Sequence, residues 1–146
     1  MEDPDIHPRL LEDCHVLGRL PHSTLLLQRN AALPWFILVP RTDLEDVLDL
    51  PGNALTEVVA EAATVSAFIK RELGYPKVNF AGLGNVVPQM HLHIIGRTAG
   101  DACWPQPVWG NLPDGGHYGE ELLRDWSTRL ENFAGLVPFA PAVLEH

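Results

Sequence analysis

The chain has 146 residues, which suits one domain with one hydrophobic core. Hydrophobic residues make up 46% and charged residues 20% of the chain, a globular composition that excludes intrinsic disorder. The formal net charge of -9 argues against a general nucleic-acid-binding protein, which would present a basic face, and no apolar run reaches the length of a membrane helix. We therefore expect neither nucleic acid nor a membrane as a partner.

The chain ends and the cysteines indicate a cytoplasmic protein. The acidic N-terminus, MEDPD, lacks the basic and apolar regions of a signal peptide. Cys14 and Cys103 lie far apart and in no metal-binding spacing, as expected in a reducing compartment. The last residues, LEH, resemble the start of a polyhistidine tag. We predict a single domain over residues 1–143 and an expression-tag remnant at 144–146.

The first third of the chain predicts three strands. Short runs rich in aromatic and branched apolar residues lie between prolines and other turn residues, which is typical of buried strands. The expected strands cover residues 14–20, 24–28 and 35–39, with a hairpin turn at 29–33.

The rest of the chain predicts two helices and two further strands. Capping-box spacing predicts a helical turn at 42–45, and Asn53 is the expected N-cap of a long helix over 54–73 with one apolar face. A strand at 77–81, a glycine turn at 82–85, a strand within 87–97 and a helix over 118–133 follow. This order predicts an α+β fold with an antiparallel sheet of about five strands, one long helix and a C-terminal helix, rather than βαβ winding.

The stretch VPQMHLHIIGR, at 87–97, alternates polar and apolar side chains without a break. In a strand, residues two apart share a face, so one set should enter the core and the other should line a cleft. The expected core set is Met90, Leu92 and Ile94, and the expected cleft set is Gln89, His91 and His93. Polar neighbours on one face lie about 6–7 Å apart, so one tetrahedral anion would fit against two or three of them.

Three interpretations of this row remain open from the residues alone. The two histidines are surface groups, or zinc ligands, or a catalytic pair. Zinc requires three or four ligands, and no CxxC or HExxH motif lies nearby. A neutral imidazole can attack phosphorus when its other N–H is held by an acceptor, and the glycine turn at 82–85 supplies backbone N–H groups for a phosphate.

The segment QMHLHII, at 89–95, resembles the signature of the histidine triad (HIT) proteins, His-φ-His-φ-His-φ-φ, in which φ is apolar. PWFILVPR, KVNFAGLGNVVPQMHLHIIGR and DACWPQPVWG resemble further family segments in the same order. The run LGNVVPQ resembles the bacterial branch related to dinucleoside polyphosphate hydrolases, with Gln at the first signature position.

The resemblance implies a nucleotide hydrolase or transferase that acts at the α-phosphate. The middle signature histidine of the family is the nucleophile and forms a nucleotidyl-histidine, a role that falls to His91. The third, His93, hydrogen-bonds the phosphate or the leaving group. With Gln89 in the first position, these residues form the expected catalytic set. The resemblance also implies a homodimer, and we expect no cofactor and no metal.

The same resemblance implies substrate contacts outside the row of three. Asn79 matches a phosphate or leaving-group contact, and Gly84 and Asn85 match the turn that contacts the phosphates. Asn30 is the nearest candidate for binding the ribose hydroxyls. Arg97 either contributes to anion binding or is a solvated charge at the end of a strand.

The chain departs from the family pattern at two positions. Gln89 replaces the first signature histidine and cannot titrate near neutral pH, so any orienting or proton-linked role must be met differently. Trp35 stands where many members carry another histidine, and we expect it to alter the shell behind His91. Trp104 and Trp109 lie in a proline-bracketed loop that either buries its indoles or reaches over a nucleotide site, its own or that of a partner subunit.

Three functions follow. The first is hydrolysis of a nucleotide phosphoanhydride or phosphoramidate, such as a diadenosine polyphosphate or an adenosine 5′-phosphoramidate. The second is a nucleotide-binding regulatory module with weak turnover, motivated by Gln89. The third is a zinc-binding protein that uses His91 and His93.

Overall fold

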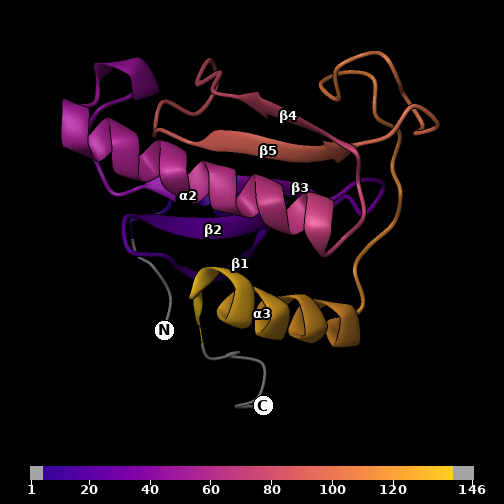
Figure 1. Cartoon of the computed structure of the whole chain (residues 1–146). Coiled ribbons are helices and arrows are strands. Elements are labelled where there is room, and N and C mark those ends of the chain that lie inside the picture. The colour runs from indigo at the N-terminus through magenta and orange to yellow at the C-terminus, as the bar shows by residue number, and fades with distance from the viewer. Residues whose placement is uncertain (1–4, 140–146) are drawn as a thin grey trace.

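The computed structural model describes residues 5–139, so the predicted domain end and tag remnant lie outside the described residues. One antiparallel sheet has the strand order β4-β5-β3-β2-β1-β6 (Figure 1). The strands are β1 (Cys14–Arg19), β2 (Ser23–Gln28), β3 (Trp35–Pro40), β4 (Lys77–Ala81), β5 (Leu92–Arg97) and the two-residue β6 (Val137–Pro138). The helices are α1 (Pro8–Asp13), the 3-10 helix η1 (Val47–Asp49), α2 (Gly52–Arg71) and α3 (Glu120–Ala134). The predicted α+β class is confirmed, with six strands in place of about five.

Helices α2 and α3 lie against one face of the sheet (Figure 1). The main core fills the space between these helices and the sheet. The apolar stripe of α2 is buried against its own sheet at Val58, Ala62, Val65, Phe68 and Ile69. The predicted core set of the alternating stretch, Met90, Leu92 and Ile94, also enters this core, with 2% or less of each residue exposed.

We call the opposite side of the sheet the site face. It carries Trp35 and Ile37 from β3 together with His93, Ile95 and Arg97 from β5, because alternate residues of a strand share a face. A second apolar cluster covers this side, with contributions from the N-terminal segment and from the loop that follows β5. The site face is therefore enclosed by the chain itself.

Several local predictions were wrong. Residues 42–45 form bends and no helical turn, because the Thr42 hydroxyl accepts the N–H of Leu44 two residues on, a local bond that competes with helix formation. Helix α2 begins at Gly52 with Pro51 at its N-cap, so Asn53 lies inside the helix. The short helix α1 was not predicted.

The signature strand is shorter than the alternation predicts. Strand β5 begins at Leu92, so Gln89 and His91 precede the first ladder residue. Strand β4 is one of the two edge strands of the sheet, and Phe80 on it is 50% exposed.

The predicted homodimer is not tested by the structure of a single chain and stays a prediction.

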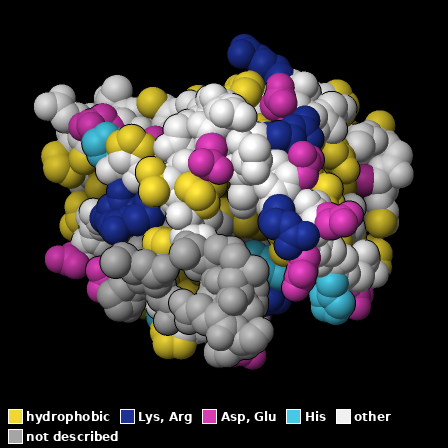
Figure 2. Space-filling model, turned by 90° about the horizontal axis from the view of Figure 1, so that it is seen from below, with side chains coloured by type: hydrophobic (Ala, Val, Ile, Leu, Met, Phe, Trp, Pro, Cys, Tyr) yellow, Lys and Arg dark blue, Asp and Glu magenta, His cyan; other side chains and the backbone are white. Residues whose placement is uncertain are grey.

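The described part of the chain contains no helix both long and apolar enough to cross a membrane. Figure 2 shows the molecule from below the view of Figure 1, with Lys and Arg side chains interspersed among Asp and Glu side chains. The surface visible there therefore offers no large positive patch.

Candidate active site

His91 and His93 lie side by side at the start of β5. Their ring centroids are 5.0 Å apart and the ring planes meet at 68°. His91 is 9% exposed and His93 is 6% exposed, so the pair is more enclosed than the open cleft that the alternation predicts. Both rings stay out of the helix-side core, because the residues that point there are their neighbours Met90, Leu92 and Ile94. The site is thus a largely buried pair of rings on the site face.

The hydrogen bond of His91 fixes which ring nitrogen carries its proton. Nδ1 lies 2.7 Å from the carbonyl oxygen of Gln89, and a carbonyl can only accept. Nδ1 of the neutral ring therefore donates, and Nε2 keeps a lone pair. Among the described residues nothing hydrogen-bonds Nε2, and the buried unpartnered polar atoms belong to His15, Ser23 and Glu61 instead.

His93 is held in the opposite tautomer. The indole N–H of Trp35 donates to Nδ1 of His93 over 3.0 Å, and an indole nitrogen can only donate. Nδ1 therefore accepts, and the neutral ring carries its proton on Nε2. The bond is diagonal across the β3–β5 pair, because Trp35 lies opposite Ile95 and Ile37 lies opposite His93.

Burial keeps His93 neutral. Desolvation, and secondarily the charge of His91, lower the pKa of His93 from 6.5 to about 4. Trp109 packs edge-on against His93 at 5.0 Å and against Trp35 at 5.8 Å. One of the two loop tryptophans therefore covers the site of its own chain.

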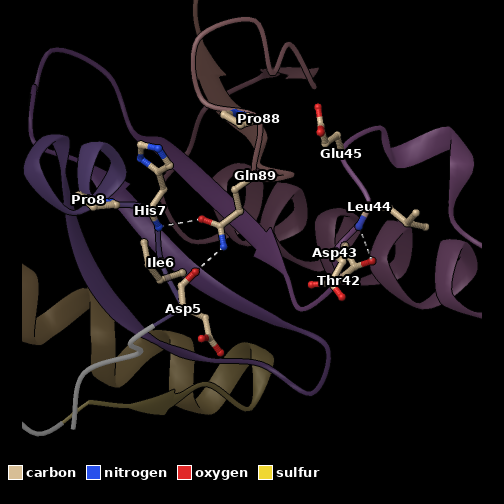
Figure 3. A pocket seen from close by; sticks show the side chains of 10 residues that line it. All are labelled: Asp5, Ile6, His7, Pro8, Thr42, Asp43, Leu44, Glu45, Pro88 and Gln89. Carbon is tan, nitrogen blue, oxygen red and sulfur yellow. Dashed lines mark hydrogen bonds between the residues drawn. The ribbon is translucent and has the colours of Figure 1, made fainter.

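Gln89 does not join the row of imidazoles. Its Oε1 accepts the backbone N–H of His7 at 2.8 Å, and its Nε2 donates to the carbonyl of Asp5 (Figure 3). The prediction that Gln89 shares a face with His91 and His93 was wrong, because Gln89 precedes the strand and its carboxamide pairs with the N-terminal segment.

A cavity of about 440 Å³ opens beside Gln89. Figure 3 shows the N-terminal segment on one side of it and residues 42–45 on the other, with Pro88 and Gln89 between them. Its lining residues are Asp5, Ile6, His7, Pro8, Thr42, Asp43, Leu44, Glu45, Pro88 and Gln89.

Asn79 and Arg97 form a second polar group on the site face. Arg97 is 1% exposed, and Nη1 donates to Oδ1 of Asn79 at 2.9 Å. Since Oδ1 is engaged, the Nδ2 amide of Asn79 is the part left to donate to a ligand. Asn79 lies opposite Ile95, two residues along β5 from His93.

Arg97 itself is fully engaged within the protein. Nε and Nη2 donate to the two carboxylate oxygens of Asp101 at 2.8 and 3.2 Å, and Nη2 also donates to the carbonyl of Gln106. Trp104 stacks over the guanidinium at 5.4 Å. Arg97 lowers the pKa of Asp101 to about 2, mainly through their hydrogen bond. The buried cation is neither a solvated strand end nor a free anion ligand.

The remaining predicted contacts lie in loops. Gly84 has a φ of +67°, which suits glycine, and in the part of the chain described here neither its N–H nor that of Asn85 donates a hydrogen bond. Asn30 accepts from the N–H groups of Ala32 and Gly115 and donates to the Pro113 carbonyl. It therefore ties two loops together, and its ribose-binding role stays a prediction.

No set of three or more His, Cys, Asp or Glu side chains within residues 5–139 is arranged to hold a metal ion.

A family model for the HIT domain matches residues 10–100 of the chain. The chain belongs to the histidine triad family. Proteins of the HIT family are nucleotide-binding proteins, hydrolases and transferases.

Solved HIT structures agree over nearly the whole chain. A histidine triad protein from Bradyrhizobium japonicum is 36% identical, with a TM-score of 0.82 over 89% of this chain and 97% of that one. One from Marinobacter aquaeolei VT8 is 36% identical, with a TM-score of 0.82 over 90% and 96%. One from Sinorhizobium meliloti 1021 is 34% identical, with a TM-score of 0.81 over 88% and 95%. A search of curated proteins gave no match.

Three contacts of this HIT site were missed from the sequence. Trp35 was expected to act behind His91, but its N–H binds His93. Asp101, the partner of Arg97, was not singled out, because it lies in a loop where spacing carries no periodic signal. The contact between Trp109 and His93 depends on how that loop folds back over the sheet.

The lowered pKa of His93 predicts a pH-dependent loss of stability. Between pH 6.5 and about 4 the unfolded chain binds a proton at His93 that the native protein does not, so the free energy of unfolding falls as pH falls. The total loss from this group is about 3 kcal/mol. His93→Gln, which retains an acceptor for the Trp35 N–H, should remove this part of the dependence in urea unfolding from pH 7 to 4.

Burial also lowers the pKa of His15, so His15 contributes a pH dependence of the same sign. This contribution is present in both proteins, and the difference between them therefore reports on His93. Equal pH dependence in wild type and His93→Gln would show that His93 is not held neutral.

Asp101→Asn should destabilise the protein by about 3–5 kcal/mol, because it leaves the buried guanidinium of Arg97 without its anion. The matched control is Glu120→Gln, which removes an exposed partner of Arg124 at 3.8 Å and should change the free energy of unfolding by under about 0.5 kcal/mol. Denaturant unfolding at pH 7 measures both. Equal small losses would contradict a buried, fully engaged ion pair.

Proposed function

We propose that the protein is a hydrolase or transferase that acts at the α-phosphate of a small nucleotide, with Nε2 of His91 as the nucleophile. The observation that carries this proposal is the pair of opposite tautomers. One ring presents a lone pair and its neighbour, centred 5.0 Å away, presents an N–H. An attacking base beside a hydrogen-bond donor is what displacement at a phosphate requires.

The proposed reaction has two steps, transfer of the nucleotidyl group to His91 and its hydrolysis. The Nε2 lone pair of His91 attacks the α-phosphorus, the bond from phosphorus to the leaving group breaks, and the leaving group departs with that electron pair. Water then attacks the phosphorus, the P–N bond breaks, and its electrons return to Nε2. The products are the nucleoside monophosphate and the protonated leaving group, with the water supplying the oxygen and the protons.

His93 acts as a hydrogen-bond donor in this scheme. With a pKa of about 4 it stays neutral at physiological pH, so its Nε2–H donates to a phosphate oxygen or the leaving group without carrying a charge. Asn79 adds its Nδ2 amide, oriented by the bond from Arg97 to Oδ1. Gly84 and Asn85 add backbone N–H groups that donate to no other group among residues 5–139. Neutral donors of this kind can hold a phosphate in a protein of net charge -9.

The substrate class we propose is a diadenosine polyphosphate or a nucleoside phosphoramidate, as the HIT resemblance implies. A nucleotide-binding module with weak turnover is the alternative, and the observation that favours it is Gln89. Its side chain is engaged with the N-terminal segment and offers no titrating group at the first signature position.

His91→Ala should reduce turnover of a panel of such nucleotides by at least about a thousandfold, because it removes the nucleophile. His22→Ala is a matched control, since the His22 side chain is 43% exposed and pairs with Glu57 on α2. A rapid quench of wild type with labelled substrate should trap a covalent nucleotidyl-protein that His91→Ala does not form. AMP binding without any adduct would favour the binding module, and full turnover by His91→Ala would refute the assignment.

A further inference from the structure

We propose that Gln89 is a positioning residue whose carboxamide couples the N-terminal segment at 5–7 to the nucleophile His91. The inference rests on the proposed function for its kinetic consequence, although the coupling can also be measured without substrate. It gives the replacement of the first signature histidine by glutamine a definite role. The N-terminal segment then acts on His91 only through the backbone groups that bind Gln89.

The chemistry of the carboxamide suits this task. One group supplies an acceptor and a donor on two atoms bonded to the same carbon. Oε1 takes the N–H of His7, and Nε2 reaches the carbonyl of Asp5 (Figure 3). Both polar atoms of the carboxamide therefore bind the backbone of residues 5–7, and Gln89 contacts this segment through two hydrogen bonds.

The N-terminal segment is a firm anchor for Gln89. Ile6 and Leu10 are each 5% exposed and pack in the apolar cluster of the site face. Pro8 begins α1 directly after the residue that donates to Gln89, and α1 leads without a break into β1. The two hydrogen bonds therefore connect Gln89 to the rim of the sheet.

The backbone of Gln89 is where this restraint reaches the nucleophile. Its carbonyl oxygen accepts the Nδ1 proton of His91 at 2.7 Å and so sets the tautomer that leaves Nε2 free. Gln89 lies three residues before β5 begins at Leu92, so no sheet ladder holds this carbonyl. The side-chain bonds to 5–7 supply the restraint that the ladder does not.

A pair of variants at position 7 tests the coupling without touching the signature. His7 has a φ of -54°, which proline can adopt, so His7→Pro removes the N–H that binds Gln89 with little change in the local backbone. His7→Ala keeps that N–H. Both variants lose the imidazole that caps α1 through the N–H of Arg9, so the comparison isolates one hydrogen bond.

We expect His7→Pro to lower kcat by about tenfold to a hundredfold while KM changes by less than about twofold, because the nucleophile loses its alignment. His7→Ala should keep kcat within about twofold of wild type. Nitrogen-15 spectra of the His91 ring should show mixed tautomers in His7→Pro and one tautomer in His7→Ala. Matching kcat values and matching ring spectra in the two variants would overturn the proposal.

Variants of Gln89 give an independent test if His7→Pro fails to fold. Gln89→Asn keeps the amide but is one methylene too short to reach both backbone groups, and it should show the mixed His91 tautomers. Unchanged ring spectra there would overturn the coupling. Absence of nucleotide turnover by the wild-type protein would contradict the proposed function. The ring spectra would still show whether the segment at 5–7 acts on His91.

Discussion

The hydrogen bond from Nδ1 of His91 to the carbonyl of Gln89 is the interaction on which the proposed chemistry of this site depends. It places the proton on one ring nitrogen and leaves the other as a base. The bond from Trp35 makes the opposite choice for His93. Two adjacent imidazoles with the same chemical formula thus present different groups, a lone pair and an N–H, because one ring faces an acceptor and the other faces a donor.

In the proposed function, the charge of a phosphate is met without Arg97 as a free cation. Arg97, the strand-end guanidinium next along β5, is neutralised by Asp101 and covered by Trp104. Its contribution is to fix Oδ1 of Asn79 and so to orient an amide. The groups that we propose to contact a phosphate are neutral N–H donors, whose positions are set by the fold before any ligand binds.

Much of this arrangement follows from local patterns in the sequence. Alternation over 90–94 correctly placed Met90, Leu92 and Ile94 in the core, and helical periodicity located α2 to within two residues at each end. These signals are reliable because the residues that create them lie within a few turns or pleats of one another. The HIT signature singled out the histidine pair, whose catalytic role stays a prediction.

The details that a pattern could not supply depend on distant contacts. The side chain of Gln89 turns away from the histidines because it meets backbone groups 82 and 84 residues earlier in the chain. Trp35 reaches His93 diagonally across two neighbouring strands, although the two residues are 58 positions apart in the sequence. Alternation assigns a face to each residue, whereas hydrogen-bond partners are set only when the segments meet.

The tautomers of the two imidazoles in the unliganded wild-type protein test the account most directly. Long-range proton–nitrogen NMR at about pH 8, above the ordinary pKa of histidine, reports which ring nitrogen carries the proton. We expect the proton on Nδ1 in His91 and on Nε2 in His93. A proton on Nε2 of His91 would leave the proposed nucleophile without its lone pair and would contradict the account.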